Sequence, residues 1–133
     1  MPFSNRACIE SLYTSLARGD APAAFARMDA EIVWYEAENF PYSDRNPYLG
    51  PAAVAEGVFH RLATDWDSFQ AIPDEFLDAG DTIVVTGRYR ATYKATGIAL
   101  DAQFAHIWRL RDGKVTAFQQ YTDTAQANRV VAG

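Results

Sequence analysis

Two strand-like segments joined by an Asp-Gly pair constrain the fold of this chain more than any other feature. Residues 104–110 and 115–123 each alternate between larger apolar and more polar side chains with a period of two, which is typical of half-buried β-strands. Asp112-Gly113 lies between them, and Asp-Gly favours a two-residue hairpin turn. The sequence therefore predicts an antiparallel β-hairpin over most of the last third of the chain.

The turn also predicts which residues of the hairpin face each other. Counting outward from Asp112-Gly113 pairs His106 with Gln119 and Phe104 with Tyr121. The face that we expect to be covered then carries Phe104, His106, Trp108, Gln119, Tyr121 and Asp123. Polar groups need partners when they are buried, so an imidazole and a carboxylate among aromatic rings indicate a ligand pocket more than a plain core.

The rest of the chain predicts an α+β fold. Capping residues and helical spacing predict helices over about 5–18 and 20–28 and a third that begins at Pro51. Alternation and turn residues predict strands over 31–38, 70–78, 82–93 and 98–110. A turn at Thr96-Gly97 would place Gly87 opposite His106 and leave room above the imidazole. We expect the helices to cover one face of the sheet.

Composition and charge narrow the classes of function. The 133 residues suit a single domain over 1–133, and a formal net charge of −5 argues against nucleic acid or an anionic membrane surface as partner. Cys8 is the only cysteine, which favours a reducing, cytoplasmic location. The first residues have no apolar run of the signal-peptide kind, and no stretch is long enough for a membrane span.

Several short motifs along nearly the whole chain carry a resemblance to a known superfamily. They are residues 17–20 (ARGD), 32–36 (IVWYE), 48–51 (YLGP), 77–81 (LDAGD), 105–109 (AHIWR), 112–115 (DGKV) and 120–124 (QYTDT). In these motifs and in its order of elements the chain resembles the nuclear transport factor 2-like (NTF2-like) superfamily, which includes ketosteroid isomerase and the SnoaL-like polyketide cyclases. The resemblance implies a cone-shaped fold with three N-terminal helices packed on a curved mixed or antiparallel sheet.

The resemblance also implies roles for individual residues. Glu36 stands where ketosteroid isomerases place a carboxylate base, and His106 stands where they place a proton donor on the penultimate strand. Leu12 occupies the position of their first-helix tyrosine, and Tyr13 lies one residue round the helix. SnoaL-like cyclases place an acid/base aspartate late on the last strand, which Asp123 matches, and a pocket histidine, which His106 matches.

Each candidate catalytic residue also has a plain structural interpretation. Asp123 could be solvated or could cap the segment that begins at Thr124, His106 could be hydrogen-bonded within the core, and Glu36 could be a solvated residue before a loop. Candidate ligand-binding residues are Trp34, Phe76, Tyr89, Phe104, Trp108, Gln119 and Tyr121, although such aromatic residues are more often core than ligand cage.

We expect a cofactor-free isomerase, cyclase or lyase that moves protons on an apolar or aromatic carbonyl-type ligand. Asp123 would be the main acid/base, His106 would polarise a carbonyl or share the proton, and Glu36 would be a second carboxylate. The alternative is a non-catalytic ligand-binding or dimerisation module. No glycine-rich phosphate loop indicates a nucleotide cofactor, and with His60 as the only other histidine we expect no metal site.

The opposite face of the predicted sheet carries a mixed set of side chains: Arg88, Arg90, Ile107, Arg109, Phe118 and Gln120. Members of the superfamily commonly pair through this face. The resemblance therefore implies a homodimer with a two-fold interface on the outer face of the sheet.

Overall fold

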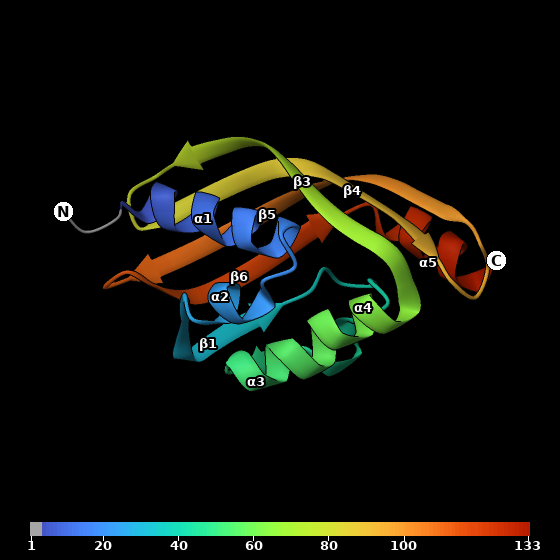
Figure 1. The fold of residues 1–133 in the computed structure, drawn as a ribbon, viewed down its shortest axis with the longest axis horizontal. Coiled ribbons are helices and arrows are strands. Elements are labelled where there is room, and N and C mark those ends of the chain that lie inside the picture. The colour runs from blue at the N-terminus through green and yellow to red at the C-terminus, as the bar shows by residue number, and fades with distance from the viewer. Residues whose placement is uncertain (1–3) are drawn as a thin grey trace.

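The computed structural model describes residues 4–133 as a curved six-stranded sheet with helices packed against it (Figure 1). The helices are α1 (Asn5–Ala17), α2 (Ala21–Phe25), α3 (Pro51–Val54), α4 (His60–Asp65) and α5 (Thr124–Ala132). The strands are β1 (Met28–Tyr35), β2 (Tyr48–Leu49), β3 (Trp66–Asp78), β4 (Thr82–Tyr93), β5 (Ala99–Arg111) and β6 (Lys114–Thr122). Within these residues no helix has the length and apolar character needed to cross a membrane.

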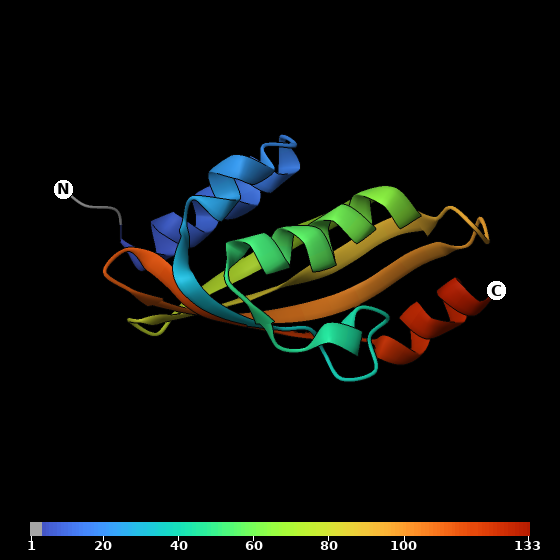
Figure 2. The same cartoon turned by 90° about the horizontal axis from the view of Figure 1, so that it is seen from below.

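The sheet is mixed, and most of the helices lie on one side of it. Its strand order is β2-β1-β6-β5-β4-β3, with β1 parallel to β6 and every other pair antiparallel. Figure 2 shows α1, α2, α3 and α4 over the concave face, whereas α5 lies beyond the other side near the end of the molecule. The predicted α+β architecture is therefore confirmed.

The helices differ in detail from the three N-terminal helices that we expected. The third helical region follows β1 and β2, and a π-helical segment, Ala55–Phe59, separates α3 from α4 within it. The count of three N-terminal helices is thus not confirmed. Helix α5 was not predicted at all, although Asp123 accepts a hydrogen bond from the backbone N–H of Gln126 at 3.0 Å as its N-cap.

The β5–β6 hairpin turns at the predicted residues but has a different register. Asp112 and Gly113 have φ values of +52° and +75°, as a two-residue hairpin turn of the favoured kind requires. Leu110 then pairs with Val115, but the register shifts before the next pair, which leaves Thr116 as an extra residue in β6. Such a β-bulge moves every later side chain of that strand to the opposite face.

The β4–β5 connection is also longer than predicted, but its effect is milder. Tyr93 pairs with Ile98 across the turn, so that Gly87 lies opposite Phe104 and Val85 lies opposite His106. The prediction that Gly87 leaves room above the imidazole is wrong. A Cβ at Gly87 would instead come within 2.2 Å of the Ile72 carbonyl oxygen of β3. Because the register moved by two residues, each side chain keeps its predicted face.

We predict that Gly113→Val lowers the free energy of unfolding by about 1–3 kcal/mol, because a β-branched residue is strained at positive φ. Urea unfolding followed by circular dichroism would measure the change. Arg111→Val is the matched control, since Arg111 is an exposed strand residue across the turn. Equal midpoints for wild type and Gly113→Val would contradict the turn geometry.

Candidate active site

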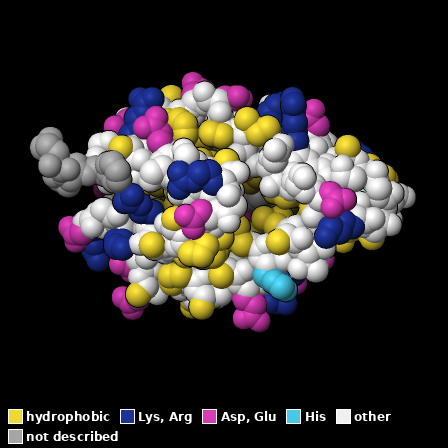
Figure 3. All heavy atoms as spheres, viewed as in Figure 1, with side chains coloured by type: hydrophobic (Ala, Val, Ile, Leu, Met, Phe, Trp, Pro, Cys, Tyr) yellow, Lys and Arg dark blue, Asp and Glu magenta, His cyan; other side chains and the backbone are white. Residues whose placement is uncertain are grey.

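A cavity of about 950 Å³ lies between the concave face of the sheet and the helices that cover it. In Figure 3 hydrophobic side chains gather around a hollow on this face. Its aromatic walls include Tyr13, Trp34, Phe40, Phe59, Trp66, Phe69, Phe76, Tyr89, Trp108 and Phe118. Among the described residues that line it, the only charged side chains are the carboxylates Glu10 and Glu36. The cavity therefore favours neutral or cationic ligands over anions.

His106 lies at the centre of a hydrogen-bonded chain inside the cavity. The Tyr13 hydroxyl is 2.5 Å from His106 Nδ1, and the Tyr89 hydroxyl is 2.5 Å from His106 Nε2. Helix α1 supplies Tyr13, β4 supplies Tyr89 and β5 supplies the histidine. Phe104 stacks on the imidazole with 4.0 Å between ring centroids. The ring is thus held in one orientation by its neighbours on every side.

Two further donors complete this chain at its ends. The indole N–H of Trp108 donates to the Tyr13 hydroxyl at 3.0 Å, and the Gln120 amide donates to the Tyr89 hydroxyl at 2.9 Å. The amide oxygen of Gln120 accepts from the backbone N–H of Ala37 at 3.0 Å, which fixes the orientation of the amide. The hydroxyl oxygens of Tyr13 and Tyr89 therefore each accept one hydrogen bond from an N–H group, which cannot accept one in return.

The positions of the protons in the Tyr13–His106–Tyr89 hydrogen-bond network show which hydrogen-bond donor a ligand can use. Burial lowers the pKa of His106 to about 3, so at neutral pH the imidazole carries one N–H and one bare nitrogen. One of Tyr13 and Tyr89 donates to the bare nitrogen, and the other accepts from the N–H. The hydroxyl hydrogen of that second phenol has no acceptor within this network of side chains. It is available to an acceptor oxygen on a ligand in the cavity.

Glu36 provides a titratable carboxyl in the same cavity. Its side chain is 3% exposed, and its Oε2 accepts a hydrogen bond from the indole N–H of Trp34 at 3.0 Å. Burial raises the pKa of the Glu36 carboxyl to about 7, although the Trp34 hydrogen bond and the charge of Arg61 oppose the rise. Such a carboxyl can take up or release a proton near neutral pH.

The backbone around Glu36 is held in place by one side chain of the loop that follows β1. Asn46 accepts from the Glu36 backbone N–H and donates to the Glu36 carbonyl oxygen, each at 2.9 Å. After burial, the charge of Glu36 is the largest cause that raises the pKa of the Tyr89 phenol. Glu36 and Tyr89 both line the cavity, so the carboxyl and the phenol can act on one ligand.

The structure places Asp123 outside this cavity, contrary to our expectation. Its carboxylate is exposed and accepts from the backbone and side chain of Gln126, and these hydrogen bonds lower its pKa. Gln119 and Tyr121 also face away from the cavity, and Tyr121 is 53% exposed. All three were misplaced for one reason, because the bulge at Thr116 inverts the end of β6.

The other predicted site residues lie in or beside the cavity. Trp34, Phe76, Tyr89 and Trp108 line it together with His106 and Glu36, while Phe104 is buried beside His106 without lining it. Two residues that we had assigned to the outer face of the sheet, Phe118 and Gln120, face inward and line the cavity instead.

Tyr13 is the main site residue that sequence reasoning missed. Leu12 does stand one position earlier and is buried, but the Tyr13 hydroxyl reaches the cavity and contacts His106. The broad apolar stripe of α1 already contained Tyr13, and a buried phenol needs a hydrogen-bond partner. This need for a partner was the signal in the sequence that could have identified Tyr13 as a site residue.

No cluster that could hold a metal ion is present in the part of the chain that the structure describes, where no three His, Cys, Asp or Glu side chains come together. Around His106 the cavity brings together the Glu36 carboxyl, the neutral imidazole, the phenols of Tyr13 and Tyr89 and the Gln120 amide among aromatic rings. This set can bind an apolar molecule, donate a hydrogen bond to it and exchange a proton with it.

Comparison with known proteins places this geometry in a family. A family model described as the SnoaL-like domain matches residues 9–118. The chain belongs to the SnoaL-like domain family. The matched region of this SnoaL-like domain contains Tyr13, Glu36, Tyr89 and His106, whereas Gln120 and Asp123 follow it. No curated protein matches the chain.

Solved structures confirm the predicted NTF2-like fold. An NTF2-like protein from Burkholderia thailandensis E264 is 32% identical, with a TM-score of 0.92, over 97% of this SnoaL-like chain and 98% of that chain. An NTF2-like protein of unknown function from Burkholderia pseudomallei K96243 is 27% identical, with a TM-score of 0.88, over 98% and 100% of the two chains. TerC, co-crystallised with polyporic acid, is 26% identical, with a TM-score of 0.85, over 97% and 98%.

Proposed function

We propose that this SnoaL-like protein is an enzyme that moves a proton within a neutral, largely apolar small molecule that carries a carbonyl oxygen. The observation that carries the proposal is the buried Glu36 carboxyl with a pKa of about 7, in one cavity with a phenol hydrogen that has no acceptor among residues 4–133. The co-crystallisation of the related TerC with polyporic acid supports an organic small molecule as ligand.

The proposed reaction needs no group beyond these side chains. The Glu36 carboxylate removes a proton from the carbon next to the carbonyl, and the electron pair of that C–H bond moves towards the carbonyl oxygen. Tyr13 or Tyr89 donates its hydrogen bond to that oxygen as negative charge develops there. Glu36 then returns the proton to another carbon in an isomerase. In a cyclase the new carbanion attacks a second carbonyl, and the proton goes to the resulting alkoxide.

His106 acts in this scheme as a positioning residue. With its pKa near 3 it neither gains nor loses a net proton at neutral pH. It accepts a hydrogen bond from one phenol and donates to the other, so that one phenol hydrogen stays directed to the ligand. The choice among isomerase, cyclase and lyase depends on the substrate.

The test measures proton exchange without knowledge of the natural substrate. Acetophenone is incubated with the protein in heavy water, and loss of its methyl proton signal is followed by nuclear magnetic resonance. We expect protein-dependent exchange that rises with pH through about 7, as Glu36 ionises. All three tryptophans of the chain line the cavity, so quenching of their fluorescence reports binding independently.

A non-catalytic ligand-binding module is the second candidate, and the aromatic walls of the cavity favour it. For this candidate fluorescence shows saturable binding that is unchanged from acid to neutral pH, and no deuterium enters the ligand across a panel of neutral aryl ketones. That combination would overturn the enzymatic proposal.

We also propose that two copies pair through the outer face of the sheet. Tyr35 and Tyr121 lie on neighbouring strands of this face and are 41% and 53% exposed. Such exposed aromatic rings are enriched at interfaces. Light scattering at micromolar concentration should give twice the 14.8 kDa of one chain, and Tyr121→Asp should lower this mass. A wild-type mass of 14.8 kDa would reject the dimer.

A further inference from the structure

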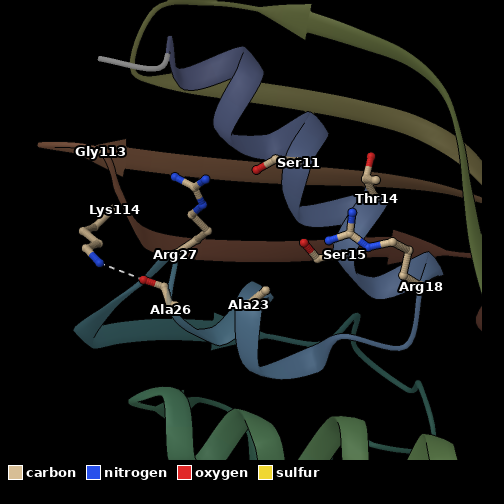
Figure 4. A pocket seen from close by; sticks show the side chains of 9 residues that line it. All are labelled: Ser11, Thr14, Ser15, Arg18, Ala23, Ala26, Arg27, Gly113 and Lys114. Atoms are coloured by element: carbon tan, nitrogen blue, oxygen red, sulfur yellow. Dashed lines mark hydrogen bonds between the residues drawn. The ribbon is translucent and has the colours of Figure 1, made fainter. Parts of the chain in front are cut away.

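A second hollow, separate from the aromatic cavity, lies between α1, α2 and the β5–β6 turn (Figure 4). Its volume is about 660 Å³. Helix α1 stands between the two hollows, because Tyr13 faces the aromatic cavity whereas Ser11 and Ser15 face this groove. A ligand in the groove would therefore not occupy the proposed active site.

The charge of the groove is opposite to that of the whole protein. The chain has 17 acidic and 12 basic residues, yet among the described residues the groove is lined by Arg18, Arg27 and Lys114 and by no Asp or Glu. Figure 4 shows these cationic side chains around one space, from α1, from the end of α2 and from the start of β6. A local surplus of positive charge in an acidic protein attracts anions to this place.

Two of the cations are held close together at one end of the groove. The Lys114 ammonium donates to the Ala26 carbonyl oxygen at 2.7 Å, which fixes its position beside the neighbouring Arg27. The charges of Arg27 and Lys114 both act on the Cys8 thiol. Burial raises its pKa, and Arg27 and Lys114 both oppose that rise.

Ser15 provides a hydroxyl at the other end of the groove. The residue is 8% exposed, and its hydroxyl is open to the groove. Figure 4 shows this hydroxyl directed into the groove beside the Arg18 side chain. A ligand oxygen in the groove would accept its hydrogen bond.

From these contacts we infer that the groove is a binding site for a phosphate group, either free phosphate or the phosphate of a small organic monoester. The oxygens of phosphate can accept from the Ser15 hydroxyl and the Arg18 guanidinium, while Arg27 and Lys114 lie at the other end of the groove. The groove is open to solvent, and we expect a dissociation constant of about 1 mM or tighter.

The test is a titration of the isotopically labelled protein with sodium phosphate, with sodium chloride added to keep the ionic strength constant. We expect saturable shifts of the Ser15 and Arg18 backbone amide signals. Arg18→Gln and Ser15→Ala should each weaken the affinity at least ~5-fold. Arg129→Gln is the matched control, because it removes the same charge from exposed helix α5.

The outcomes separate a site from general attraction to positive charge. Shifts that do not saturate, or an equal loss of affinity in Arg129→Gln and Arg18→Gln, would overturn the proposal. Phenyl phosphate tests the source of the phosphate. Tighter binding than inorganic phosphate supports an organic monoester as ligand, and equal binding supports free phosphate. None of these measurements depends on catalytic activity, so the groove and the proposed reaction are tested separately.

Discussion

Glu36→Gln should reduce the rate of protein-dependent proton exchange by at least ~100-fold, because general acid–base catalysis by a placed side chain contributes about that much or more. Glutamine has nearly the same shape and can still accept the hydrogen bond from Trp34, so ligand affinity should change little. The measurement is the exchange rate at saturating ketone, with affinity taken from tryptophan fluorescence. A loss in the maximal rate with unchanged affinity assigns Glu36 to the chemical step.

Asp123→Asn is the matched control for this experiment. It removes a carboxylate that lies outside the cavity, and asparagine also serves well as the N-cap of α5. We expect full exchange activity from this variant. If Asp123→Asn lost activity while Glu36→Gln kept it, the base would be Asp123, and the assignment of the cavity as the active site would be wrong.

His106→Gln should remove a large part of the acid sensitivity of the fold. Burial lowers the pKa of His106 to about 3 in the folded protein, against about 6.5 when unfolded. Above pH 6.5 both states are neutral and the residue has no effect on the pH dependence. As the pH falls below 6.5, only the unfolded state gains the proton, so stability falls by about 1.4 kcal/mol per pH unit.

Protonation of Glu36 has the opposite effect on the stability of the fold over part of this pH range. Its pKa of about 7 lies above the ordinary carboxyl value, so as the pH falls through 7 the folded state gains a proton first and is stabilised. This stabilisation is complete below the unfolded pKa near 4.3. The two effects largely offset each other between pH 6.5 and 4.3, and the His106 effect alone continues at lower pH.

Urea unfolding of wild type and His106→Gln between pH 3.5 and 7.5 measures the histidine contribution as a difference. The free-energy gap between the two proteins should change by roughly 4 kcal/mol from pH 6.5 to 3.5. His60→Gln is the matched control, because it replaces an exposed histidine by the same residue. A constant gap for His106→Gln would contradict a neutral, buried imidazole.

Much of the fold could be predicted because its signals are local. Alternation and turn residues predicted β4 with its observed bounds, and Asp112-Gly113 predicted the hairpin turn. Within β1 and β5 the side chains keep the predicted parity, and for that reason Trp34, Glu36 and His106 were assigned to the cavity correctly.

The wrong assignments of β6 residues to the cavity come from one β-bulge, which the residue types do not predict. Thr116 is an ordinary strand residue, and nothing at this position signals a bulge. Yet a single extra residue exchanges the two faces of the rest of the strand. Our prediction therefore placed Asp123 in the cavity and Gln120 outside it. In the structure Gln120 lines the cavity and Asp123 lies outside it as the N-cap of α5. Parity arguments weaken with each residue counted away from a turn.

The parallel pairing of β1 with β6 has a consequence for the order of folding. β1 is synthesised before the other strands, but its long neighbour in the sheet is the last strand, β6. Until residues 114–122 have left the ribosome, β1 has only the two-residue β2 to pair with. Contacts so distant along the chain form late and slow folding. We therefore expect a nascent chain that ends at Asp112 to hold α1 and β1 loosely and to lack the cavity.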